Sequence, residues 1–385
     1  MRVLVTTTGG TGHVYPVVPI ARAFHQAGHD VVWATSPSSC RVVKRLGFPA
    51  RPAGMDPNDR IARFSELHPE IISIPPRDRR PIAFTGSFAE IAAPVMLSHL
   101  STFFDEIAPD LVVHEVAELG VTPIATSRGV RRVVVGYSGA LPPPVLASTA
   151  EAVKAVWATV SLAVPDDVGL YSQDYLHPFA EPLGQRPASG VVRDFRPIAA
   201  EGIETIHDVQ WLTRLGVDRP AAYITYGTEM GPLAPWPALL GALANIDVDA
   251  IVTTGNGVDL DPLLVEFDDA TRSRIHVRDY VPQAAVLERA SVVVSHGGAG
   301  TMLAAARTAI PQIVVPFGAD QFDNADAFAS AGVAVALDSS NLNADGFAEQ
   351  LHAMLTNERA RRAAIDLADH FASMPHPNEV VVNLL

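Results

Sequence analysis

The sequence predicts an α/β protein made of two doubly wound, Rossmann-like domains. Short runs rich in Val and Ile alternate with longer helical patterns along the chain, which is typical of βαβ units whose parallel strands are buried on both faces. This rhythm occurs twice, before and after a polar segment near residue 200. The length of 385 residues also corresponds to about two domains.

The first domain is expected at 1–197, with strands at 2–7, 30–35, 111–114 and 132–137. A glycine-rich turn follows its first strand, and a helix follows the turn, with Pro16 as a favourable early residue and Gly28 as a stop. Residues 198–207 are expected to be the linker. The second domain, 208–370, repeats the pattern with strands at 221–226, 249–254, 274–277, 291–296, 312–317 and 333–337.

Composition excludes several classes of protein. A net charge of −14 argues against a nucleic-acid partner, which requires a dense basic surface. A single cysteine excludes an internal disulfide and a thiolate-rich metal site. The first residues are typical of a strand and not of a signal peptide, and no run approaches the ~18 apolar residues of a membrane span. We therefore expect a cytoplasmic protein without a membrane span.

Small, polar and ionisable residues follow the predicted strands in both halves. In open α/β sheets ligands bind beyond the carboxyl ends of the strands, so these residues predict a ligand in a cleft between the two domains. The segments concerned are 8–13 (TGGTGH), Glu115, 227–231 (GTEMG), 253–255 (TTG), 296–301 (HGGAGT) and 317–324 (FGADQFDN).

Several familiar motifs fail. Gly10 and Gly12 fit the dinucleotide fingerprint, but Tyr15 occupies its third glycine position and no acidic residue ends the second strand. No phosphate-binding loop of the G-x-x-x-x-G-K type occurs. The stretch 114–118 (HEVAE) lacks the second histidine of a zinc motif. We expect no metal site.

The stretch 292–306 (VVVSHGGAGTMLAAA) is more informative. A buried strand leads through glycines directly into a helix, whose N-terminus carries a partial positive charge and unpaired N–H groups. This arrangement binds an anion without a lysine, although a tight turn without any ligand would have the same sequence pattern. Segment 316–324 then places polar side chains at the end of the next strand, which suits a polyhydroxyl group beside a phosphate.

Residues 279–324 resemble the donor-binding signature of family 1 glycosyltransferases with the GT-B fold, and most of all the bacterial macrolide and enediyne sugar transferases. Residues 10–35 are similar to that family's acceptor-side opening. The resemblance covers most of the chain and is weakest at about 54–100 and 138–200. It implies two domains facing across a cleft, with a C-terminal helix, 371–385, that packs back on the first domain.

The resemblance also implies roles for single residues. His13 corresponds to the general base that takes the proton of the acceptor hydroxyl, and Glu115 stands where the family usually has an aspartate that orients this histidine. Tyr280 is expected to stack on the nucleotide base, and Asp320 and Gln321 to hold the sugar. The donor-binding residues expected in this way are Gly12, Thr228, Tyr280, Val281, Gln283, His296, Gly298, Ala299, Gly300, Thr301, Asp320 and Gln321.

The predicted function is inverting, metal-independent hexosyl transfer from a dTDP- or UDP-sugar, without a cofactor beyond this co-substrate. A histidine can deprotonate the alcohol, and a helix N-terminus can stabilise the leaving diphosphate. The apolar segments 64–104 and 138–180 predict a hydrophobic natural-product aglycone as acceptor, although they also suit ordinary core helices. The residues expected to line its pocket are Phe84, Phe88, Tyr137 and Trp157.

Other functions remain open at this point. A nucleotide-sugar 2-epimerase of the same fold would need no acceptor pocket. A peptidoglycan-type N-acetylglucosaminyltransferase has a similar glycine loop. A catalytically silent partner of an active transferase would not need His13 and Glu115. The family resemblance also leaves a homodimer open.

Overall fold

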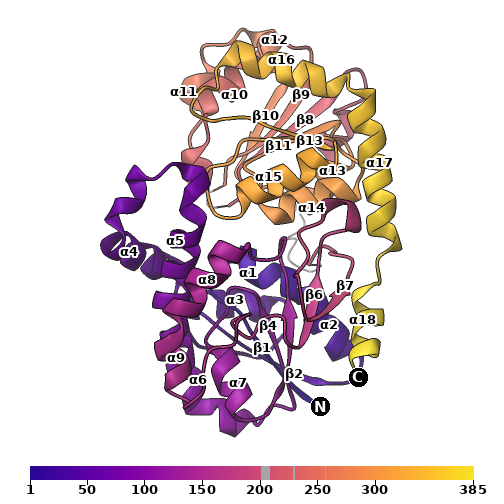
Figure 1. Cartoon of the computed structure of the whole chain (residues 1–385). Helices are drawn as coiled ribbons and strands as arrows, with labels where there is room; N and C mark the ends of the chain where they lie inside the picture. Colours follow the sequence, from indigo (N-terminus) through magenta and orange to yellow (C-terminus); the bar gives the residue numbers. More distant parts are fainter. Residues whose placement is uncertain (201–208, 229, 256) are drawn as a thin grey trace. The chain divides into compact units, whose positions relative to one another are not determined.

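The computed structural model describes residues 1–200, 209–228, 230–255 and 257–385, which form two compact units (Figure 1). The first unit comprises Met1–Phe179, Gly184–Ile203 and Met374–Leu385, and the second comprises Ala180–Leu183 and Glu204–Ser373. Most of the predicted linker, 201–207, lies outside the described residues. Each unit has its own parallel sheet and its own apolar core.

The sheet of the first unit has seven parallel strands in the order β3-β2-β1-β4-β5-β6-β7. The strands predicted from Val- and Ile-rich runs are β1, β2, β4 and β5. Three shorter strands, β3, β6 and β7, have no such run and were not predicted. The bounds are β1 Arg2–Thr6, β2 Asp30–Thr35, β3 Ala50–Pro52, β4 Leu111–Glu115, β5 Arg131–Val135, β6 Asp174–His177 and β7 Val191–Asp194.

Helices cover both faces of this sheet (Figure 1). Their bounds are α1 Thr11–Val14, α2 Val18–Gln26, α3 Pro37–Arg45, α4 Pro57–Leu67, α5 Arg80–Phe84, α6 Ala93–Ile107, α7 Val121–Ser127, α8 Pro143–Ala152, α9 Lys154–Ala158 and α18 Pro377–Leu384. The 3-10 helices are η1 Tyr15–Val17, η2 Pro69–Ser73 and η3 Pro76–Arg79, and η4 Thr85–Ala92 is a π-helix.

The order of strands creates a switch point between β1 and β4. The chain runs outward from β1 through β2 to β3, and then returns to add β4 on the other side of β1. The register pairs Val3 with Leu111 and Thr6 with His114, so the two strands end side by side. Connections that leave neighbouring strands in opposite directions open a crevice at their carboxyl ends. The segments after Thr6 and His114 both begin there.

The second unit repeats this topology with six parallel strands in the order β10-β9-β8-β11-β12-β13. Its switch point lies between β8 and β11, and every strand predicted in this half is present. The bounds are β8 Ala221–Thr225, β9 Asp249–Thr253, β10 Ile275–Arg278, β11 Val292–Ser295, β12 Gln312–Val314 and β13 Ala334–Ala336.

The helices of the second unit begin with short segments and end with the longest helix of the unit, α17. Their bounds are α10 Trp236–Ala242, α11 Asp261–Leu264, α12 Asp269–Arg272, α13 Gln283–Leu287, α14 Ala299–Arg307, α15 Gln321–Ser330, α16 Ala344–Leu355 and α17 Glu358–Ser373. Short turns are η5 Glu181–Leu183, η6 Gln210–Arg214 and η7 Gly231–Leu233.

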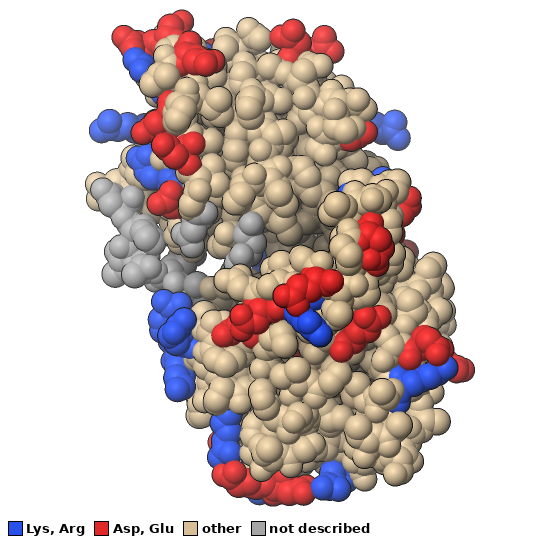
Figure 2. Space-filling model, turned by 90° about the vertical axis from the view of Figure 1, so that its left-hand side faces the viewer, with Lys and Arg blue, Asp and Glu red and all other residues tan. Residues whose placement is uncertain are grey.

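The distribution of surface charge and one long apolar helical run concern possible binding to nucleic acid or to a membrane. On the face shown in Figure 2, Lys and Arg lie in small groups among acidic and uncharged residues. Among the described residues, the run Pro76–Ile107 is long and apolar enough to cross a membrane by length and composition alone. Half of its most apolar window is buried inside the protein, and core helices of globular proteins pass the same test.

The last helix, α18, packs against α2 in the first unit (Figure 1). Val380, Val381 and Leu384 are buried in the same apolar cluster as Phe24 of α2. The N-terminus of α18 is closed by a capping box, in which the His376 side chain accepts from the Asn378 N–H and the Glu379 carboxylate accepts from the His376 N–H. The end of the chain is therefore part of the core of the first unit.

Val381→Ala should destabilise the first unit by about 2 kcal/mol, because it removes two buried methyl groups and leaves a cavity. Val381 is 0% exposed, whereas its neighbour Val382 is 66% exposed. Val382→Ala should therefore change the free energy of unfolding by less than about 0.5 kcal/mol. Urea denaturation of both variants measures the difference, and equal effects would contradict the packing of α18.

Candidate functional site

His13 lies in the first helical turn after β1, at the switch point of the first unit. The chain turns sharply at Gly10, whose φ of +112° favours glycine. At Gly9, a Cβ atom would lie 2.5 Å from the Ser36 hydroxyl oxygen, so a larger residue would not fit. The Gly10 carbonyl accepts hydrogen bonds from the N–H groups of His13 and Val14. These two glycines allow the strand to pass directly into the helix that carries His13.

Glu115 ends β4 and is completely buried. Its Oε1 accepts from the Thr8 backbone N–H at 3.1 Å and the Thr8 hydroxyl at 2.8 Å, while Oε2 accepts from the Ala117 N–H at 2.5 Å. Burial alone would raise the pKa of Glu115. The His13 imidazole and these N–H donors outweigh burial, so the pKa of Glu115 lies below its usual value. The buried carboxylate is therefore ionised at neutral pH.

The imidazole of His13 is held between this carboxylate and two aromatic rings. Its Nδ1 lies 3.3 Å from Glu115 Oε1, which is longer than an ideal charge-assisted hydrogen bond. Phe88 and Tyr137 contact the ring edge-on, with centroids at 5.2 and 5.3 Å. A carboxylate beside Nδ1 favours the tautomer with the proton on Nδ1. The other nitrogen, Nε2, then has a free lone pair and can accept a proton.

Two of the four predicted acceptor residues contact His13, namely Phe88 and Tyr137. Phe84 is buried behind them and contacts Phe88 at 5.1 Å between ring centroids. Trp157 is only 1% exposed and lies within the apolar core of the first unit. Its burial argues against the expected acceptor role, because a ring enclosed by core residues offers no surface to a ligand.

In the second unit, a glycine-rich loop joins β11 to α14, and Gly298 is the N-cap of this helix. At Gly298 a Cβ atom would lie 2.5 Å from His296 Nε2, and at Gly297 it would lie 2.8 Å from a Val314 methyl group. Both glycines are therefore required by packing. At Gly300 a Cβ atom would meet nothing within 4 Å. The absence of a side chain there leaves the first turn of α14 accessible to a ligand.

His296 lies beside this helix N-terminus as a neutral imidazole. Burial lowers the pKa of His296 to about 4, although the nearby Asp320 carboxylate opposes the shift. Its Nδ1 is buried and has no hydrogen-bond partner among the described residues. A neutral imidazole donates from one nitrogen only, so His296 can offer one hydrogen bond to a ligand.

Asp320 and Gln321 begin α15, but their side chains already have partners within the unit. Gln321 Oε1 accepts from the N–H groups of Phe317 and Gly318, at 2.8 and 3.2 Å. Asp320 Oδ2 accepts from the Asn324 side chain at 3.0 Å. These bonds fix the loop after β12. The side-chain NH₂ group of Gln321 and Oδ1 of Asp320 take no part in these hydrogen bonds.

The other predicted donor residues lie in the second unit, except for Gly12. Gln283 donates from Nε2 to the Thr301 hydroxyl at 3.2 Å, which ties α13 to α14. Tyr280 is 45% exposed, and its predicted contact with a nucleotide base stays a prediction. Thr228 is exposed, whereas Val281 and Ala299 are buried. Gly12, in the first unit, is exposed in the turn before His13.

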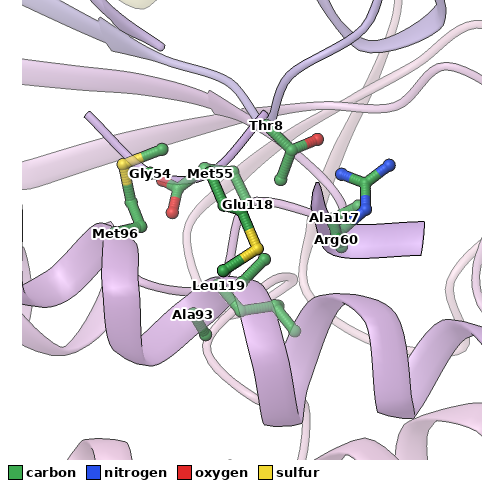
Figure 3. Close-up of a pocket in the computed structure, with 10 residues that line it drawn as sticks. Thr8, Gly54, Met55, Arg60, Ala93, Met96, Ala117, Glu118 and Leu119 are labelled. Atoms are coloured by element: carbon green, nitrogen blue, oxygen red, sulfur yellow. The ribbon is translucent and has the colours of Figure 1, made fainter. Parts of the chain in front are cut away.

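Two functional candidates, Glu118 and Arg60, were not predicted from the sequence. Both line a small pocket with Thr8 (Figure 3). Glu118 is buried, and its carboxyl accepts from the Thr6 hydroxyl at 2.6 Å and from the Gly120 N–H at 2.8 Å. Its position three residues after Glu115 is a signal in the sequence. Nothing in the sequence distinguishes Arg60 from Arg63, the other arginine of α4.

The part of the chain that the structure describes contains no group of three or more His, Cys, Asp and Glu side chains that could hold a metal ion. The carboxyl groups of Glu115, Glu118 and Asp320 instead accept hydrogen bonds from backbone or side-chain donors in their own unit. The chemistry that the two sites offer is proton acceptance at His13 and hydrogen-bond donation at the start of α14.

Comparison with known proteins decides the family. The chain is 31% identical to L-demethylnoviosyl transferase from Streptomyces niveus over 398 residues, which cover 100% of this chain and 97% of that protein. The chain belongs to the family 1 antibiotic glycosyltransferases. Tylactone mycaminosyltransferase from Streptomyces fradiae is 28% identical to this glycosyltransferase, covering 100% of this chain and 92% of the relative. Residues 237–385 match the family model described as erythromycin biosynthesis protein CIII-like, C-terminal domain.

Solved structures establish the fold of the glycosyltransferase as GT-B. The glycosyltransferase VinC, in complex with dTDP, superposes with a TM-score of 0.78 at 22% identity and covers 100% of this chain and 98% of that one. The spinosyn rhamnosyltransferase SpnG gives a TM-score of 0.79 at 21% identity, with the same coverage. The predicted fold class is thus confirmed, and the relatives named above confirm glycosyltransferase as the enzyme class.

Stability of the glycosyltransferase should depend on the ionisation of Glu118. Burial raises the pKa of Glu118 from 4.5 to about 7, with the nearby Glu115 charge adding to the shift. The contribution of the protonated Glu118 carboxyl to stability is fully present below pH 4.5, and it is lost as the pH rises through 7. Glu118→Gln stays neutral, so its melting temperature relative to wild type should rise by several degrees between pH 5 and pH 8.

Thermal denaturation at a series of pH values measures this difference. The matched control is Glu151→Gln, because the Glu151 side chain is 73% exposed. The control should follow wild type at every pH. A constant difference between Glu118→Gln and wild type across this range would contradict a raised pKa for Glu118.

Proposed function

We propose that the enzyme transfers a hexosyl group, with inversion, from a nucleoside-diphosphate sugar to a hydroxyl of a hydrophobic natural-product aglycone. The observation that carries this proposal is the His13 imidazole held against a buried, ionised Glu115. The donor would be a dTDP- or UDP-sugar, and dTDP is favoured because the VinC and SpnG structures include complexes with that nucleotide. The names of two relatives state the acceptors tylactone and aklavinone, which supports an acceptor of this class.

In this mechanism His13 Nε2 takes the proton of the acceptor hydroxyl, and the hydroxyl oxygen attacks the anomeric carbon of the donor sugar. The positive charge that develops on the imidazole is stabilised by the Glu115 carboxylate, which lies 3.3 Å from Nδ1. The bond from the anomeric carbon to the diphosphate oxygen breaks, and its electron pair leaves with the diphosphate. Glu115 itself keeps its charge and orients the base.

Inversion is supported by the position of Glu115. Retention through a covalent intermediate would require a carboxylate that can reach the anomeric carbon. Glu115 is 0% exposed, lies behind His13, and has its oxygens engaged by Thr8 and Ala117. A single displacement by the acceptor oxygen needs only the base.

The diphosphate would bind at the start of α14. The backbone N–H groups of α14 point out of its first turn, and the helix dipole favours negative charge there. Gly300 leaves this turn accessible, and the neutral imidazole of His296 adds one donor. Hydrogen bonds aimed at the leaving oxygens favour the transition state, in which their negative charge grows.

His13→Ala should lower kcat by ~10²–10⁴, the usual contribution of a general base, and leave the affinity for dTDP unchanged. The control is His352→Ala, because His352 is exposed on α16 in the second unit. A His13→Ala enzyme with full activity would overturn the mechanism.

The acceptor class is tested separately, by measuring transfer to a panel of aglycones, oligosaccharides and lipid-linked acceptors. Transfer confined to oligosaccharides or lipid carriers would overturn the acceptor class.

Transfer should persist in EDTA, because α14 and His296 can stabilise the diphosphate without a divalent cation. The measurement compares initial rates after exhaustive dialysis against EDTA with rates after Mg²⁺ or Mn²⁺ is restored. Equal rates are expected. A rate that vanishes in EDTA and returns with either ion would show that the diphosphate is held through a metal.

A further inference from the structure

Arg60 is the one buried residue of α4, a helix whose other described positions are half-buried or exposed. The side chain is 8% exposed, and its guanidinium lies over the ring of Phe88, 4.6 Å from the ring centroid. The same ring also contacts His13, at 5.2 Å between centroids. Helices normally bury apolar side chains, so an arginine as the buried residue of α4 requires an explanation.

The guanidinium of Arg60 has no acceptor for its buried donors. Nε and Nη1 are both buried and have no hydrogen-bond partner among the described residues. Two carboxyl groups of this region are already engaged. Glu115, whose charge acts on Arg60, is bound by Thr8, Ala117 and His13. Glu118, which lines the same pocket, is bound by Thr6 and Gly120. Figure 3 shows the Arg60 guanidinium and the Glu118 carboxyl on opposite sides of Met55.

A buried charge without partners is unfavourable for the folded protein, and such groups are typically retained for binding or catalysis. Burial lowers the pKa of Arg60, although the charges of Glu115 and Tyr137 oppose the shift. An arginine stays charged even so. The buried face of the guanidinium is therefore ready to donate to an anionic group.

We propose that Arg60 binds an anionic oxygen of the acceptor, a carboxylate or an ionised phenol, on the same aglycone whose hydroxyl reaches His13. This inference rests on the proposed function and specifies the acceptor: an aromatic body with an acidic group beside the hydroxyl that is glycosylated. Phe88 connects the two sites, because His13 and Arg60 lie against its ring.

The surroundings of Arg60 leave room for one small polar group. The pocket that it lines holds about 10 Å³, and its lining includes the Thr8 hydroxyl, the Glu118 carboxyl and the apolar side chains of Met55, Met96 and Leu119. Arg60 is the only basic residue among these lining residues. A buried guanidinium N–H makes a short, charge-assisted hydrogen bond to an anionic oxygen. One such bond matches one acidic group, whereas a polyanionic acceptor would require a cluster of basic residues.

The test measures binding without turnover, by calorimetry with 1-hydroxy-2-naphthoate and its methyl ester, which has a neutral ester group, one methyl larger, in place of the carboxylate. Wild type should bind the acid about 10–100-fold more tightly than the ester, as expected for charged hydrogen bonds. Arg60→Met should bind both alike, and Arg60→Lys should keep part of the preference. The matched control is Arg63→Met on the same helix, because Arg63 is exposed and pairs with Glu66. It should behave as wild type.

Two further readouts separate binding from a structural role. The melting temperature of Arg60→Met should be unchanged or higher than that of wild type, because an unpaired buried charge is removed. Its affinity for dTDP should be unchanged. No binding of the acid by wild type, equal binding of acid and ester, or a preference that survives in Arg60→Met would overturn the inference. If wild type prefers the acid to the ester but transfers sugar to none of the acceptors, the proposed function alone is overturned.

Discussion

A buried negative charge on Glu115 is the constraint on which the first unit depends. The carboxylate is stable there only because strand β4 ends beside β1, which brings the Thr8 N–H and hydroxyl to one of its oxygens. The other oxygen is bound by the Ala117 N–H. Without these donors, burial would neutralise the acid, and His13 would lose the charge that orients it. The turn at Gly9 and Gly10 is part of the same requirement, since it brings the imidazole within 3.3 Å.

The two units use one topology for opposite electrostatic tasks. Each sheet reverses its strand order beside its first strand, β1 or β8, and each places its functional loop at that point. In the first unit the end of β4 carries a carboxylate, Glu115, that favours positive charge on His13. In the second unit the loop after β11 leads into α14, whose N-terminus favours negative charge. His296 stays neutral beside it, because burial lowers its pKa to about 4.

Much of this organisation follows from local sequence. The Val-rich strands and the glycine turns are visible because buried parallel strands and strand-to-helix turns restrict the residues that they accept. The shorter strands β3, β6 and β7 depend on pairing with neighbouring strands, and none is a long Val- and Ile-rich run. Trp157 was expected at the acceptor site, but the fold encloses it, since apolar composition alone does not separate core from pocket. Arg60 differs from Arg63 only through tertiary packing.

The most direct test of the central claim is the tautomer of His13, measured by ¹⁵N NMR on histidine-labelled protein at neutral pH. The signals of His13 are assigned by their absence in His13→Ala. A buried, ionised Glu115 predicts a protonated Nδ1 and an unprotonated Nε2 for His13, and Glu115→Gln should lose this preference. A proton on Nε2 in the wild-type protein, or an unchanged spectrum in Glu115→Gln, would contradict the role of Glu115 as the group that orients the base.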